Sequence, residues 1–392
     1  MSRNIGVVVR GIRGPIVRQG DDLVKIVVDS LSSAVESDKI ILKNNDIIGV
    51  TEAVVAKAQN NYATIENIGE DIHNKFGNEV GIVFPITSRN RFSVVLKGIS
   101  KGVDKLFIQL SYPSDEVGNY LISQDALDES NVNPHSDTLT EDEFTRIFGK
   151  TYHQWTDVDY IELYKSMTDG KAVFIFSNDP KAILKYTKNV LAADIHTRFR
   201  TKKILKNSGA EIVYGLDEIL SSPVSGSGYN PDYGLLGSNL SGENKLKLFP
   251  RDCNKFVSDV KNEIDKKFNI DSNVLIYGDG AFKDPSAKIW ELADPVVSPG
   301  YTKGLEGTPN EIKLKYVADT TLAGLSKEDA EKELVNLINS KPDTNKTQVS
   351  QGTTPRRIVD LIGSLCDLTT GSGDKGTPFV LIQGYFDNYA ND

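Results

Sequence analysis

The stretch RRIVDLIGSLCDLTTGSGDKGTPFVLIQGY, residues 356–385, joins three local patterns that together decide the class of fold. Its first part has apolar residues at helical spacing, and FVLIQ near its end is a continuous run typical of a buried strand. Between them, TTGSGDKGTP at residues 369–378 carries three glycines, one Asp and one Lys. A helix that leads through a glycine-rich loop into a strand indicates an α/β protein.

The glycine-rich loop has two interpretations. Successive glycines can expose backbone N–H groups that bind an anion such as phosphate, and Lys375 would add a positive charge. The loop does not match the Walker pattern, because Lys375 precedes Gly376 and the loop follows a helix instead of starting one. Taken alone, the pattern favours a hinge over a phosphate site.

Strands alternate with helices through the rest of the chain, and no internal repeat is found. The sequence predicts strands at 4–12, from 46 onward, at 79–86, at the start of 105–119, and at 171–176, 210–215, 272–280 and 311–319. It predicts helices at 21–35, 88–102, 179–191, 194–209, 252–268, 326–339 and 353–368. This order favours an α/β fold, with α+β as the alternative. We expect a mixed-sheet core built from both chain ends and a second, inserted lobe.

The composition is that of an ordinary globular protein. Of the 392 residues, 25% are charged and 39% hydrophobic, and the net charge of −9 argues against a general affinity for nucleic acid or anionic membranes. The two cysteines, Cys253 and Cys366, are far apart, so neither a disulfide framework nor a zinc site is expected. The chain has no run of about 20 apolar residues and no signal-peptide pattern, so we expect a cytoplasmic protein.

Three further features are candidates for chemistry, each with a simpler reading. Asp279 ends an apolar strand, where it could bind Mg²⁺ or Mn²⁺ or form an ordinary Asp-Gly turn. His196 and Arg198 begin a basic helix that could hold a carboxylate or phosphate, or be a solvated face. Lys57 lies among apolar residues and could neutralise phosphate or extend to solvent.

Five segments in the same order resemble the coenzyme F420-0 γ-glutamyl ligases. The string DLIGSLCDLTTGSGDKGTPFVLIQG is similar to that family's C-terminal signature of Asp, apolar helix, Gly-rich loop, Gly-x-Pro and a strand ending in Gly. The segments RGPIVRQGDDL, NDIIGVTEAVVAKAQ, GLLGSN and VLIYGDG match further family segments. The resemblance covers residues 5–60 and 234–384, and residues 100–232 have no clear counterpart.

The resemblance implies a division into three parts. Residues 1–98 would form the N-terminal part of a ligase-like core, and 99–232 an insertion or elaborated central domain. Residues 233–392 would form the C-terminal part of the core, which carries the nucleotide loop. The resemblance also implies a homodimer.

The activity that the resemblance implies is a nucleotide- and metal-dependent ligase. It would join L-glutamate or a similar amino acid to a small carboxylate through an acyl phosphate, with GTP (or ATP) and with Mg²⁺ or Mn²⁺. The nucleotide site would be lined by Gly14, Pro15, Ile16, Val17, Glu52, Ala53, Lys57, Asn239, Thr370, Gly371, Ser372, Gly373, Asp374, Lys375, Gly376 and Thr377. The metal would bind Asp279, Asp232 and Asp374, and the substrate His196 and Arg198. No catalytic side chain is predicted.

Three positions depart from the family's pattern. Leu236 stands where the family has a metal-binding Asp, Gly280 where it has a hydroxyl ligand, and Ser372 where it has an acid. These differences favour an alternative, a catalytically silent relative that binds a nucleotide or metabolite and has a regulatory role.

Overall fold

The computed structural model describes residues 5–88, 92–153, 156–278, 297–309, 311–340, 357–371, 373, 375–388 and 390. These residues pack into two compact units. Unit 1 comprises residues 5–55, 252–278 and those from 297 onward, and unit 2 comprises residues 56–251. Within these ranges, none of the helices combines the length and the apolar character that crossing a membrane requires.

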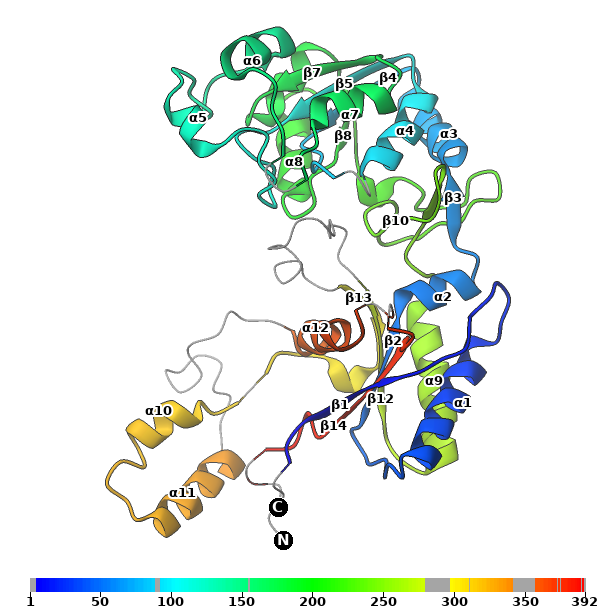
Figure 1. Ribbon diagram of the computed structural model, residues 1–392, viewed down its shortest axis with the longest axis vertical. Coiled ribbons are helices and arrows are strands. Elements are labelled where there is room, and N and C mark those ends of the chain that lie inside the picture. The colour runs from blue at the N-terminus through cyan, green and yellow to red at the C-terminus, as the bar shows by residue number, and fades with distance from the viewer. Residues whose placement is uncertain are drawn as a thin grey trace. The chain divides into compact units, whose positions relative to one another are not determined.

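Unit 1 is built on a five-stranded mixed sheet whose strands come from both ends of the chain (Figure 1). Across the sheet the strands are β1 (Val8–Ile12), β14 (Phe379–Gln383), β2 (Ile47–Thr51), β12 (Asn273–Gly278) and β13 (Val297–Tyr301). β2 and β12 are parallel, and the other neighbours are antiparallel. The predicted α/β class and the predicted core from both chain ends are confirmed.

Helices cover both faces of this sheet. α12 (Ile358–Thr370) packs on one face, and α1 (Leu23–Ser37) and α9 (Cys253–Phe268) lie on the other (Figure 1). Because side chains alternate between the faces of a strand, Leu275 and Tyr277 share a core with Cys366 of α12. Gly49 of β2 lies so close that a Cβ there would stand 2.6 Å from the Cys366 sulfur.

The predicted strand over 311–319 is wrong, because α10 (Leu314–Asp319) occupies that segment and α11 (Lys327–Ser340) follows it. The alternation of apolar and charged residues fits a strand, but a strand needs a neighbour for its backbone groups. No described strand pairs with this segment, and a helix bonds its own backbone. Of its apolar residues Val317 is buried, while Leu314 stays 44% exposed. Before this segment, the described part of unit 1 also contains the short helix η4 (Lys303–Leu305).

Unit 2 contains a six-stranded sheet and a small antiparallel one. The large sheet has the order β6 (Leu139–Thr140), β7 (Ala172–Phe176), β5 (Lys105–Leu110), β4 (Glu79–Val83), β8 (Asn189–Ala192) and β9 (Ile212–Gly215). All neighbours are parallel except β6 with β7. The small sheet has the order β10 (Asn239–Leu240), β11 (Lys245–Lys247) and β3 (Tyr62–Thr64).

The predicted helix over 179–191 is also wrong. It is the short helix η1 (Pro180–Lys185) followed by strand β8. Asp179 caps η1 by accepting a hydrogen bond from the Lys181 amide at 3.0 Å, but Val190 and Leu191 pair between β4 and β9 and are fully buried. A strand buried on both faces is apolar on both faces, so its sequence lacks the alternation that distinguishes it from a helix.

The remaining helices of unit 2 include a close pair. They are α3 (Ile65–Phe76), α4 (Phe92–Gly102), α5 (Gln124–Asp128), α6 (Glu141–Phe148), α7 (Tyr160–Met167), α8 (Arg198–Asn207) and η2 (Leu216–Glu218), and α2 (Glu52–Ala58) lies at the boundary between the units. α3 and α4 meet at glycines: a Cβ on Gly102 would lie 2.2 Å from the Gly69 carbonyl oxygen.

By packing, the chain divides at Val55 and Arg251. The sequence-based division at residues 98 and 232 describes which parts match the family pattern, and it stays a prediction.

The glycine contact between α3 and α4 predicts a cost for a single methyl group. Gly102→Ala should destabilise the protein by about 1–3 kcal/mol, because the methyl would overlap backbone atoms that cannot move away cheaply. The thermal unfolding midpoint measures this cost. Gly6→Ala is the matched control, since nothing lies within 4 Å of its added Cβ. Equal midpoints for the two variants would contradict the packing described here.

Candidate functional site

The candidate site lies in unit 1, at the edge of the sheet where β2 and β12 end. These parallel strands are in register, so that Thr51 faces Tyr277. Glu52 follows Thr51 directly and begins α2. The carboxyl ends of parallel strands meet at one edge, which is where α/β proteins bind ligands. Asp279, the predicted metal ligand, follows Gly278 in the sequence and lies outside the described residues.

Glu52 and Gly278 are in close contact at this edge. Glu52 is 3% exposed. A Cβ on Gly278 would lie 2.1 Å from the Glu52 Cγ, so the strand end accepts only glycine beside this side chain. The sequence thus places a buried carboxyl group against the last residue of β12.

The glycine-rich loop begins as the C-terminal cap of α12. Gly371 adopts a left-handed conformation (φ 55°), and its amide donates to the Asp367 carbonyl at 2.7 Å. The amide of Gly373 donates to the Thr370 carbonyl at 3.2 Å, and that of Gly376 to the Gly373 carbonyl at 2.9 Å. These amides serve the loop's own turns, and a helix C-terminus is electronegative. The exposed Lys375 side chain is therefore the anion-binding group that this loop offers.

Three contacts hold the loop over the ends of β2 and β12. The Thr370 and Tyr277 hydroxyls are hydrogen-bonded at 2.8 Å. The Thr51 amide donates to the Pro378 carbonyl at 3.0 Å. A Cβ on Gly373 would lie 3.5 Å from the Thr51 Cγ2. Both ends of the loop are thus hydrogen-bonded to β2 and β12, close to Glu52 and Gly278.

The N-terminal segment reaches the same loop. β1 pairs with β14, with Ile12 opposite Phe379. A Cβ on Gly11 would lie 3.1 Å from Thr377, and one on Gly14 would lie 2.8 Å from Pro378 and Phe379. The structure therefore brings Gly14 beside the end of the loop, and the nucleotide site itself stays a prediction.

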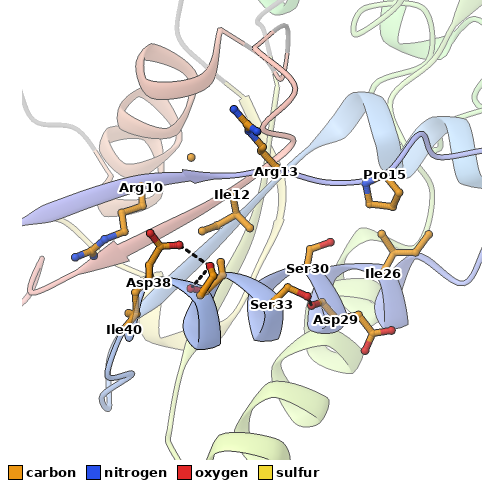
Figure 2. A pocket seen from close by; sticks show the side chains of 13 residues that line it. Arg10, Ile12, Arg13, Pro15, Ile26, Asp29, Ser30, Ser33, Asp38 and Ile40 are labelled. Carbon is orange, nitrogen blue, oxygen red and sulfur yellow. Dashed lines mark hydrogen bonds between the residues drawn. The ribbon is translucent and has the colours of Figure 1, made fainter.

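Beyond this segment, a groove of about 900 Å³ opens between β1 and α1 (Figure 2). Its apolar wall includes Ile12 and Ile26, and Ser30 and Ser33 line it from α1. Arg13 is exposed and belongs to the lining, as does Arg10, whose guanidinium donates to the Gln383 side chain at 2.8 Å. The groove combines apolar surface with two arginines and with the carboxylates of Asp29 and Asp38, so its charge is mixed. In the sequence Arg13 stands between Ile12 and Gly14 and gives no sign of a groove, which depends on α1 packing under β1.

The other predicted site residues belong to unit 2. Lys57 is exposed in the last turn of α2, and Asn239 is half-buried in β10. Asp232 and His196 are exposed. Arg198 is paired with Asp217, with 3.1 Å between its Nε and the carboxylate oxygen.

Two of the three predicted metal ligands, Asp279 and Asp374, lie outside the described residues, as does Ser372 of the predicted nucleotide site. The third metal ligand, Asp232, is exposed in unit 2. Within the part of the chain that is described, no three His, Cys, Asp or Glu side chains are grouped as a metal site needs.

The sequence matches the family model described as F420-0:Gamma-glutamyl ligase over residues 11–384. Because the match covers nearly the whole chain, the protein belongs to this family, and the resemblance found in the sequence is confirmed. The matched range includes residues 100–232, for which the sequence showed no clear counterpart. A search of curated proteins found no match.

The contact between Glu52 and Gly278 predicts a coupled pair. Gly278→Ala should destabilise the wild-type protein by about 1–3 kcal/mol, because its methyl overlaps Glu52. In a Glu52→Ala background the same change should cost clearly less, since the overlapping carbon is gone. Thermal or denaturant unfolding of the four proteins gives the coupling energy. The same cost in both backgrounds would show that the methyl group added at residue 278 does not meet the Glu52 side chain.

Proposed function

From membership of this family, we propose that the protein is a GTP- and divalent-metal-dependent ligase. It joins L-glutamate, or a similar amino acid, to a small carboxylate through an acyl phosphate, with ATP as the alternative nucleotide and Mg²⁺ or Mn²⁺ as the metal. A cytoplasmic location and a homodimeric state are part of this proposal and rest on the sequence.

The observation that carries the proposal is the convergence of four segments at one sheet edge. Gly14, the loop up to Thr377 and the ends of β2 and β12 come together in unit 1. They are far apart in the sequence; Gly14, the loop and Glu52 after β2 were predicted to contact the nucleotide, and Asp279 after β12 to bind the metal. A ligand at this edge would meet backbone from several elements and the positive charge of Lys375, which is what a triphosphate needs.

The chemistry requires charge neutralisation more than covalent assistance from the protein. In the first step a carboxylate oxygen of the acceptor attacks the terminal phosphorus of GTP, and the bond to the β-phosphate oxygen breaks to release GDP. In the second step the amino nitrogen of glutamate attacks the acyl carbon, and phosphate leaves as the amide forms. The ammonium group of glutamate loses one proton to become nucleophilic and a second as the amide forms, and both protons pass to the released phosphate or to water. Lys375 stabilises the negative charge on the phosphates.

A divalent metal would add positive charge between the phosphate groups. Asp279 and Asp374 are the residues proposed to hold it, and the burial of Glu52 at the end of β12 adds a carboxyl group at that edge. Carboxylate oxygens are the ligands that Mg²⁺ and Mn²⁺ prefer, so the residue types at this edge fit the metal.

The groove between β1 and α1 is the proposed place for the carboxylate acceptor. It lies next to the segment that carries Gly14, and Arg10, which lines it, carries a guanidinium that can pair with a carboxylate. Arg198 suits this role less well, because it already pairs with Asp217.

One observation favours the alternative of a binding protein without turnover. Leu236, which stands where the family has an acid, packs against the hydrophobic core of unit 2. Phosphate release in the presence of GTP, metal and carboxylate acceptors distinguishes the two. Nucleotide binding without release under any of these conditions would select the regulatory alternative.

The nucleotide proposal predicts the effect of removing one charge. Lys375→Ala should weaken GTP binding about tenfold or more, because a hydrogen bond to a charged group contributes about 1.5–3 kcal/mol. Calorimetric titration with GTP and Mn²⁺ measures this change. Lys315→Ala is the control, since Lys315 is equally exposed and lies on α10. Unchanged affinity in Lys375→Ala, or the same loss in both variants, would refute the role of the loop.

A further inference from the structure

The large sheet of unit 2 has a point where its strand order reverses. Chain order runs from β4 outward to β5 and β7, then returns to the other side of β4 with β8 and β9. In parallel sheets of this kind, neighbouring loops part on opposite sides of the sheet at such a reversal, and ligands bind in the crevice between them. The carboxyl ends of β4 and β8 are therefore the place in unit 2 to examine for a binding site.

The loop that follows β5 makes hydrogen bonds to the residues after both of these strands. Asp115 accepts hydrogen bonds from the amide of Thr87, after β4, at 2.9 Å and from its hydroxyl at 3.0 Å. The next residue, Glu116, accepts from the backbone amides of Ile195 and His196, after β8. The carboxylate of Glu116 thus lies at the N-terminal end of α8, and Glu116 is exposed to solvent. An anionic ligand would have to displace it.

Near Glu116 lies the buried carboxyl group of Asp194, which has fewer hydrogen-bond donors than it can accept. Asp194 is fully buried, and its Oδ2 accepts from the hydroxyls of Thr197 at 2.7 Å and Thr201 at 2.6 Å. Its Oδ1 has no hydrogen-bond partner among the described residues. A buried acceptor left without a donor costs about 1–3 kcal/mol, so its presence calls for an explanation.

The two carboxyl groups converge on one hydroxyl. The Thr197 Oγ lies 2.7 Å from an Asp194 oxygen and 3.2 Å from a Glu116 oxygen. A hydroxyl has one proton to donate, so it cannot serve both. Burial, together with the nearby charge of Glu116, raises the pKa of Asp194. The geometry therefore leaves acceptor capacity at Asp194 Oδ1 that no described donor fills.

We infer that this cluster (Glu116, Asp194, Thr197) binds the protonated amino group of the amino-acid substrate. An ammonium group supplies several donors and a positive charge, which the cluster lacks, whereas a phosphate or carboxylate is repelled by both acids. Glu116 and Thr197 are exposed to solvent, and Thr197 contacts the fully buried Asp194. The exposed ring of His196, adjacent in the chain, is suited to the carboxylate of the same zwitterion. This inference rests on the proposed ligase activity.

The test compares ligands with and without the ammonium group. The full-length protein is titrated with L-glutamate and with N-acetyl-L-glutamate up to millimolar concentrations, using calorimetry or NMR. L-Glutamate should bind, and N-acetyl-L-glutamate should bind about tenfold more weakly or not at all. Equal affinity for the two, or no binding of L-glutamate, would overturn the inference.

Variants then assign the contact to this cluster. Asp194→Asn and Glu116→Gln should each weaken L-glutamate binding about tenfold, while Glu211→Gln, an exposed acid at the opposite end of the sheet, should leave it unchanged. Glu116 is exposed, so Glu116→Gln keeps the test valid if Asp194→Asn fails to fold. Normal affinity in Glu116→Gln would overturn the inference.

GTP binding is measured on the same samples. If GTP binds and L-glutamate does not, this inference fails and the nucleotide site stands. If L-glutamate binds at the cluster and GTP does not bind, the ligase proposal fails instead.

Discussion

The parallel pairing of β2 with β12 is the constraint on which the candidate site depends. It places Thr51 opposite Tyr277, so that the residues following both strands emerge at one edge of the sheet. The amide of Thr51 and the hydroxyl of Tyr277 then bond to the two ends of the glycine-rich loop. A slip of one residue would turn the side chains of the shifted strand to the opposite face and separate these contacts.

Unit 2 also has parallel strands whose carboxyl ends lie at one edge of a sheet. The strand order of this sheet reverses between β4 and β8. The two edges offer different groups. The unit 1 edge has the exposed Lys375 and the buried carboxyl group of Glu52, whereas the unit 2 edge has the carboxyl groups of Asp194 and Glu116.

Much of the fold could be predicted because its strands are short apolar runs bounded by turn residues, as in SNVLIYGDG and FVLIQG. The errors have two physical causes. In 311–319 the alternating pattern fits a strand, but the segment has no described neighbour to pair with. In β8, burial on both faces removed the alternation, so the run was assigned to a helix.

The site could be predicted only in part. Family segments identified which stretches belong together, and the structure confirms that Gly14 and the loop lie side by side. The chemistry of the loop could not be predicted, because it depends on the partners of its amides. Gly371 caps α12, and the amides of Gly373 and Gly376 form turns within the loop, so the exposed Lys375 side chain is the group proposed to meet an anion. The free Oδ1 of Asp194 and the contact of Glu52 with Gly278 arise from tertiary packing and leave no local pattern.

The most direct test of the central claim is a crystal structure of the protein with Mn²⁺ and a non-hydrolysable GTP analogue, with anomalous scattering to locate the metal. The account predicts phosphate oxygens within hydrogen-bonding distance of Lys375 and manganese bound to Asp279, at the edge formed by β2 and β12. A nucleotide bound elsewhere, with the loop from Thr370 to Thr377 free of it, would contradict the account.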